Sequence, residues 1–175
     1  MNTGIALPDT AAGLKPLLAG ARLDHACMVV RDRERAINNL SLLVAGPFDR
    51  FEYTNTAIVL GERCTYTLHM ALAPLSAGVD LEIIELHAGR NPVHEQFLAE
   101  RGEGLQHLAF EVEDFDASIA AFRASGFPPM LQKESGTAVA VYMDTRSVGG
   151  FFIELVRKGF RMRDPSTWPG AEQRP

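Results

Sequence analysis

The 175-residue chain is poor in cysteine and has no apolar run long enough to cross a membrane. Its two cysteines, Cys27 and Cys64, lie far apart in sequence and form no CxxC motif. They are therefore predicted to be free thiols in a reducing compartment. A membrane helix would need about 18 consecutive apolar residues, and residues 1–20 lack the basic start of a signal peptide. These absences predict a soluble, cytoplasmic protein.

The chain also lacks an excess of basic charge. Its 17 Lys and Arg residues are outnumbered by 22 Asp and Glu residues, which gives a formal net charge of −5. Without a long basic run, no nucleic-acid partner is predicted. A hydrophobic fraction of 46% is ample for a buried core and argues against disorder. The length allows one large domain or two small modules that share a core.

What the chain does contain is an internal repeat. Residues 23–40, LDHACMVVRDRERAINNL, align without a gap with residues 105–122, LQHLAFEVEDFDASIAAF. The alignment places His25 on His107. Each copy is later followed by a carboxylate in an apolar segment, Glu82 in VDLEIIEL and Glu154 in GFFIELV. The repeat therefore supplies two histidines and two carboxylates from corresponding positions.

Hydrophobic spacing and turn residues predict the same order of elements in both copies. The first copy has a strand at 23–30, a helix at 32–44 capped by Asp32, and strands at 51–60, 64–75 and 79–86. The second has a strand at 105–112, a helix ending near 123 and capped by Asp114 or Asp116, and strands at 130–133, 138–144 and 151–156. Each module therefore reads β-α-β-β-β.

The modules divide the rest of the chain. We expect an N-terminal extension at 1–20 with a short helical piece at 11–18, a first module at 21–88, a linker helix at 89–104, a second module at 105–158 and a surface tail at 159–175. Pro92 fits the first turn of the linker helix. Residues 147–150 are predicted to form a turn before the last strand.

The repeated polar residues indicate a metal site. An isolated histidine or glutamate in an apolar strand must find a partner, because burying it unpaired is costly. Two imidazoles and two carboxylates satisfy one another around a divalent ion. Two nitrogens and two oxygens leave room for water or substrate, and suit Mn, Co, Ni, Fe(II) or Zn.

Each residue taken alone has a plainer interpretation, as a hydrogen-bonded core histidine or a solvent-facing glutamate. The joint pattern favours the metal site. Strand alternation places Glu85 on the face opposite Glu82. His69, His87 and His94 lie outside the repeated positions and are interpreted as surface or packing residues.

At residues 22–158 the chain resembles the vicinal oxygen chelate superfamily, the glyoxalase/bleomycin resistance/extradiol dioxygenase group. Its closest likeness is to methylmalonyl-CoA epimerases and glyoxalase-like relatives. The phrase HEQFLAERGEGLQHLAFEVED is similar to the FLEKRGEGIHHIAFEV stretch of those epimerases, and LEII and IELV are similar to their metal-carboxylate strands. The resemblance implies an α+β fold in which two βαβββ modules form a cupped, mostly antiparallel sheet pair.

By this resemblance His25, Glu82, His107 and Glu154 would bind one divalent metal ion. The epimerase subgroup can carry Gln at the position of Glu82. The implied activity is α-proton abstraction through a metal-stabilised enolate, with a small carbonyl compound or acyl thioester as substrate. Glu154 would act as both ligand and base. A second catalytic glutamate would be Glu62, with Glu52 as the alternative.

Two other activities stay open within the family. One is glyoxalase I-like isomerisation of a thiol–ketoaldehyde adduct, as in a lactoylglutathione lyase, and the other is non-catalytic ligand binding. The modules can pair within one chain or between two chains, and a homodimer is expected. The sequence does not distinguish the exact substrate or the metal.

Overall fold

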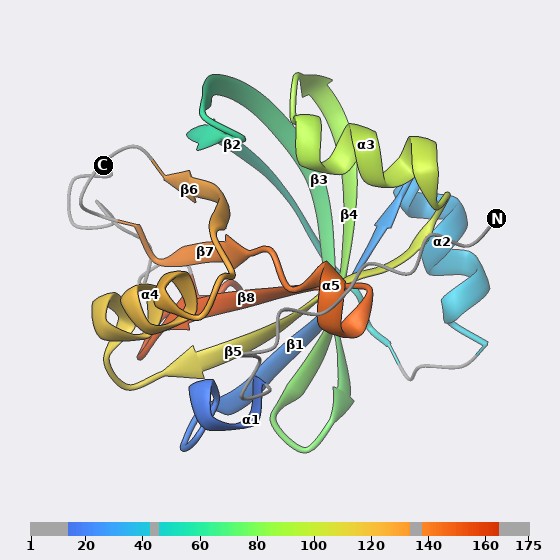
Figure 1. Ribbon diagram of the computed structural model, residues 1–175. Coiled ribbons are helices and arrows are strands. Elements are labelled where there is room, and N and C mark those ends of the chain that lie inside the picture. The colour runs from blue at the N-terminus through green and yellow to red at the C-terminus, as the bar shows by residue number, and fades with distance from the viewer. Residues whose placement is uncertain (1–13, 43–45, 134–137, 165–175) are drawn as a thin grey trace, which may run out of the picture.

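The computed structural model describes residues 14–42, 46–133 and 138–164, and in them eight strands form one closed sheet (Figure 1). The order around the sheet is β1-β4-β3-β2-β6-β7-β8-β5. The strands are β1 (Arg22–Val30), β2 (Asp49–Val59), β3 (Glu62–Ser76), β4 (Val79–Gly89), β5 (Gly104–Val112), β6 (Pro129–Lys133), β7 (Ala140–Met143) and β8 (Phe152–Arg157).

Two kinds of pairing close the sheet. The first and last strands of each half are parallel, β1 with β4 and β5 with β8. The halves then join within one chain along two antiparallel edges, β1 with β5 and β2 with β6. The α+β class agrees with the prediction, whereas the expected pair of sheets is one mixed sheet curved into a barrel. Pairing at both edges leaves no free edge between the halves.

The helices lie on both faces of this sheet. On the outer face, α2 (Arg33–Leu40) covers a cluster that includes Ile37 and Ile83, and α4 (Phe115–Ala124) covers one that includes Phe122 and Leu155. The linker helix α3 (Pro92–Glu100) instead packs Val93 and Phe97 against the inner core. Two short helices, α1 (Leu14–Leu17) and α5 (Arg146–Gly149), complete the described elements.

Several predicted helix boundaries follow from capping. The side chain of Asp32 accepts a hydrogen bond from the backbone N–H of Arg35, and Asp114 does the same for Ala117. Both are N-caps, which satisfy an otherwise unpaired donor of the first turn. Helix α2 ends at Leu40, earlier than predicted, where the hydroxyl of Ser41 donates a hydrogen bond to the carbonyl of Ile37. Such a side-chain bond competes with continuation of the helix.

Two other local predictions are wrong. Residues 146–149 form the short helix α5 rather than a turn. The segment after β8 is not wholly a surface tail, because Phe160 is buried against Ala109 and Val156. Of the helical piece expected at 11–18, the structure describes Leu14–Leu17, and residues 11–13 lie outside the described residues. Among the described residues, no helix has the length and apolar character needed to cross a membrane.

Candidate metal centre

The four repeated polar residues converge because β1 and β5 lie side by side between β4 and β8. In one cross-strand row, Cys27 has Glu82 on one side and His107 on the other. Two residues along, in the next row on the same face, Ala109 has Glu154 on one side and His25 on the other. Each row thus contains a carboxylate, a small buried residue and a histidine. The second row repeats the first with the roles of β1 and β5 exchanged, as the sequence repeat requires.

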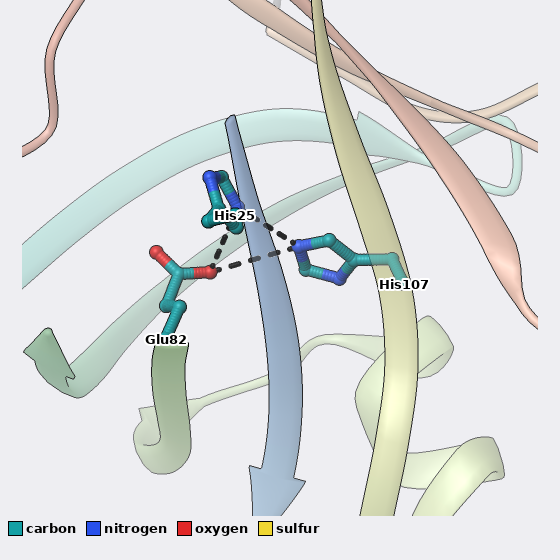
Figure 2. Close-up of side chains that lie close together, drawn as sticks. All are labelled: His25, Glu82 and His107. Atoms are coloured by element: carbon teal, nitrogen blue, oxygen red, sulfur yellow. Dashed lines mark hydrogen bonds and ion pairs between the residues drawn. The ribbon is translucent and has the colours of Figure 1, made fainter. Parts of the chain in front are cut away.

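Figure 2 shows His25 from β1, Glu82 from β4 and His107 from β5 with their polar atoms directed toward one another. The two imidazole Nε2 atoms lie 3.4 Å apart. Oε2 of Glu82 lies 3.4 Å from Nε2 of His25 and 3.6 Å from Nε2 of His107. Oε2 of Glu154 lies 3.1 and 3.3 Å from the same two atoms. All four side chains are buried.

Opposite charges decide the protonation of this cluster. Burial alone would lower the pKa of His25, but the charge of Glu82 and hydrogen bonds with Asp24 and Glu154 raise it well above its ordinary value. Burial would likewise raise the pKa of Glu82 and Glu154, yet the two histidines hold both values below the ordinary one. The carboxylates are therefore ionised at neutral pH, and each group depends on its neighbours for that state.

A β-bulge beside each histidine orients its ring. Asp24 is the extra residue between the pairs Leu23–Phe110 and His25–Ala109, and Gln106 is the extra residue between Cys27–His107 and Met28–Leu105. A bulge re-aims side chains relative to the regular alternation. The carboxylate of Asp24 lies 3.2 Å from Nδ1 of His25, and Oε1 of Gln106 lies 3.2 Å from Nδ1 of His107.

These contacts direct Nε2 of both rings into the cluster. A proton on Nδ1 of His25 or His107 is held by its acceptor, which leaves the lone pair of Nε2 available to a metal. Both acceptors immediately precede the histidines, at aligned positions of the repeat. The sequence does not indicate these two acceptors, because regular strand alternation would place neighbouring side chains on opposite faces.

His94 of α3 extends this network. It is buried, and its Nδ1 lies 2.9 Å from Nε2 of Gln106. Because Oε1 of Gln106 accepts from His107, its amide NH₂ donates to His94, whose Nδ1 is therefore unprotonated. Burial, reinforced by the nearby charge of His107, lowers the pKa of His94 to about 3. The residue is thus a neutral packing and acceptor group, in agreement with the packing role predicted for it.

We expect His94→Gln to reduce the acid sensitivity of the metal-free protein. Unfolded histidine gains a proton below about pH 6.5, whereas native His94 stays neutral to about pH 3, so stability falls as pH falls through this range. Between pH 6.5 and 4.5 the loss should be about 2 kcal/mol smaller in the variant. Urea unfolding at several pH values measures this. Equal pH dependence in both proteins would contradict a neutral native His94.

The donor set fits a divalent metal. Metal–ligand distances of about 2.0–2.2 Å place neighbouring ligand atoms about 3.0–3.5 Å apart, close to the observed separations of 3.1–3.6 Å. Oε1 of Glu82 is buried and has no hydrogen-bond partner among the described residues. A buried carboxylate oxygen without a donor is costly, and a cation would remove that cost.

A cavity of about 70 Å³ lies beside the cluster on the inner face of the sheet. Glu82 and Glu154 contribute to its wall, together with Asn55 and Tyr66, whose side chains hydrogen-bond each other at 3.1 Å. The rest of its lining is predominantly apolar: Tyr53, Leu68, Met70, Leu131, Val139, Ala140, Phe160 and Met162. The two carboxylates therefore face a space that admits a small polar group inside an apolar surround.

The segment that follows β8 forms part of the wall of this cavity. Phe160 and Met162 line it, while Arg161 forms ion pairs with Glu111 and, at 3.9 Å, with Asp24. Arg163 reaches the other half, 3.3 Å from Asp80 and 3.4 Å from Asp49. Two of these carboxylates belong to β1 and β5, the strands that also carry the histidines. The segment thus spans both halves next to the cluster.

The two candidates for a second catalytic glutamate, Glu62 and Glu52, lie away from the cluster. Glu62 is exposed at the start of β3 and pairs with Arg90. Leu72, which faces Glu82 across the sheet, lies ten residues further along the same strand, about 30 Å at the usual strand rise. Glu52 is exposed and pairs with His69, on the other face of β2 from Tyr53 and Asn55. The structure therefore brings neither residue to the cluster.

Comparison with known proteins identifies a family and a common fold. A model of the Glyoxalase/Bleomycin resistance protein/Dioxygenase superfamily matches residues 24–142. None of the curated proteins matches the chain in sequence.

Among solved structures, the methylmalonyl-CoA epimerase of Mycobacterium tuberculosis is similar at 20% identity and TM-score 0.56, over 81% of this chain and 90% of that chain. A Streptomyces coelicolor methylmalonyl-CoA epimerase variant in complex with 2-nitronate-propionyl-CoA matches at 20% identity and TM-score 0.55, over 79% of this chain and 98% of that one. A hypothetical protein from Bacillus halodurans C-125 matches at 17% and 0.55, over 82% and 99%. At these identities the likeness shows the fold.

Proposed function

The chain belongs to the glyoxalase/bleomycin resistance protein/dioxygenase superfamily, and from this premise we propose that it is a divalent-metal-dependent epimerase or isomerase. The proposed reaction removes the α-proton of an acyl thioester, such as methylmalonyl-CoA, or of a related carbonyl compound. The observation that carries the proposal is the cluster itself, in which two buried carboxylates and two buried imidazoles converge beside a cavity.

The proposed metal ligands are His25, Glu82, His107 and Glu154. Asp24 and Gln106 hold the Nδ1 side of the rings, so that both Nε2 atoms face the same point. When bound, a divalent metal acts as a Lewis acid that stabilises the negative charge developing on a substrate carbonyl oxygen. Because the donor set contains only imidazole and carboxylate, it suits Zn, Ni, Co, Mn or Fe(II).

Glu154 is the proposed base. Its carboxylate lines the cavity and is held ionised by hydrogen bonds with His107 and His25 against the effect of burial. The ionised form is the one that a general base requires, and it can act on the substrate where the α-carbon lies within reach. The apolar walls around the cavity exclude water from the developing charge. The position of Glu62 gives no support to the role predicted for it, and no step is assigned to that residue.

The proposal predicts that the metal-loaded protein exchanges the α-proton of methylmalonyl-CoA for solvent deuterium. We expect exchange to fall at least 100-fold after treatment with a chelator and to return on addition of Co²⁺, Ni²⁺, Mn²⁺ or Zn²⁺. Mass spectrometry of the recovered thioester measures the exchange. The hemithioacetal of methylglyoxal and glutathione is assayed in parallel as a second substrate.

The outcomes separate the candidate activities. Turnover of the hemithioacetal without α-proton exchange of the thioester would favour the glyoxalase-like alternative over the epimerase. Metal binding without turnover of either compound would favour a ligand-binding role. A protein that retains no stoichiometric metal under any loading condition would contradict the proposed centre.

A further inference from the structure

A second group of metal-ligand side chains lies on the outer face of β2, β3 and β4. In one cross-strand row, His69 of β3 pairs with Glu52 of β2 on one side and with Glu85 of β4 on the other. Adjacent side chains in such a row face each other across the strands. Nε2 of His69 lies 3.3 Å from Oε2 of Glu52, and Nδ1 lies 3.7 Å from Oε1 of Glu85.

A β-bulge brings His87 to this row. On β4, the pairs Leu68–Leu86 and Thr67–Ala88 leave His87 as the extra residue. Its ring stacks on that of His69, with a centroid separation of 3.7 Å and an interplanar angle of 17°. A bulge can re-aim a side chain toward a functional position. Ligand atoms of Glu52, His69 and His87 all lie within 4.8 Å of one another.

Glu85 lies beside His69 on the side opposite Glu52. Its Oε2 accepts a hydrogen bond of 2.7 Å from the backbone N–H of Arg33 at the start of α2, which anchors the carboxylate. Its other oxygen faces Nδ1 of His69, so Nε2 of that ring is directed toward Glu52. At 3.7 Å the contact between Glu85 and His69 is an ion pair rather than a hydrogen bond, so Glu85 favours this orientation of the ring through its charge.

We propose that Glu52, His69 and His87 form a second site for a divalent transition metal, with Glu85 positioning His69. Two imidazoles and one carboxylate favour Zn²⁺, Ni²⁺ or Cu²⁺, and leave a coordination position for water. Ligands at about 2.1 Å from a metal are at most about 4.2 Å apart. The stacked rings of His69 and His87 present their nitrogens in nearly parallel planes, so the exposed ring of His87 must turn for both rings to coordinate one ion. The site is independent of the inner cluster, because the two groups lie on opposite faces of the sheet.

The plainer alternative is an ion pair in which protonated His69 bridges two carboxylates. Zn²⁺ binding distinguishes the two, since an ion pair has no need for His87. Equilibrium dialysis of the full chain against Zn²⁺, read by elemental analysis, should give one equivalent fewer for His87→Ala and for Glu52→Gln than for wild type. Glu113→Gln, which changes an exposed glutamate of the other half paired with Lys158, is the matched control and should keep the wild-type stoichiometry.

The proposal is overturned if wild type, His87→Ala and Glu52→Gln bind the same number of Zn²⁺ ions. The inner centre does not affect this comparison. If the inner cluster binds no metal, wild type should bind one equivalent and the two variants none. Addition of Zn²⁺ should also shift the ring NMR signals of His69 and His87 in wild type, and leave the His69 signal unchanged in His87→Ala. An unshifted wild-type signal would contradict the site as well.

Discussion

Glu154→Gln is expected to lower the rate of α-proton exchange by about 10²- to 10⁴-fold, the contribution typical of a positioned general base. The amide is close in size to the carboxylate and keeps an oxygen near Nε2 of His25 and His107, but it cannot accept the proton. The carboxylate lines the cavity, so its loss would remove the proposed base. Single-turnover exchange with metal-saturated protein measures the chemical step.

Glu82→Gln is the matched control for this prediction. It makes the same chemical change at the corresponding position of the other half, beside the same two imidazoles. Because an amide oxygen can still occupy a ligand position, we expect retained metal and a loss of less than about tenfold. Metal content is determined for both variants by elemental analysis. Equal losses of exchange in the two variants, at equal metal content, would remove the distinction between Glu154 as base and Glu82 as ligand.

His107→Ala is expected to destabilise the metal-free protein by about 3–5 kcal/mol, the usual effect of removing one partner of a buried ion pair. The ring of His107 is fully buried and lies beside the Oε2 atoms of both Glu82 and Glu154. Without it, two buried carboxylates share one remaining histidine. Urea unfolding at pH 6.5 in the presence of a chelator measures the difference. His87→Ala, an exposed histidine of the outer face, should change stability by less than about 0.5 kcal/mol.

The pH dependence of the His107→Ala effect identifies its cause. In wild type the histidines depress the pKa of both carboxylates, so their stabilising contribution is present above about pH 4.5 and is lost as pH falls through the native values. In the variant, burial raises these pKa values, and the native state takes up protons first as pH falls. The gap in stability should therefore narrow between pH 6.5 and 4.5. A constant gap would indicate a packing defect without an electrostatic component.

The internal repeat predicts much of the site because a repeated sequence implies an approximate symmetry in the fold. Two strands with the same pattern, paired across an approximate twofold axis, place corresponding residues near that axis. For this reason the sequence alone predicts that His25 and His107 lie close together, and that the carboxylates later in each copy lie near them. The local sequence also predicts the capping residues Asp32 and Asp114, since a cap depends on residues within one helical turn.

Other features depend on register, which the sequence does not display. Asp24, Gln106 and His87 each occupy a bulge, and a bulge exists only relative to the strand beside it. The sequence predicts a surface or packing role for His87, and its contact with His69 arises from such an irregularity. The resemblance implies a catalytic role for Glu62, but ten residues of β3 separate it from Leu72, which lies in the row that contains Glu82.

By itself, the sequence determined the family, the α+β class and the four polar residues that the two halves contribute, because these follow from local periodicity and from the repeat. Only the tertiary structure decided that the halves close into a single sheet, which neighbours orient each imidazole, and that Phe160 and Met162 line the cavity. The physical reason is the separation in sequence over which each kind of interaction acts. Periodicity and capping act over a few residues, whereas strand register, burial and electrostatic coupling join residues that are distant in sequence.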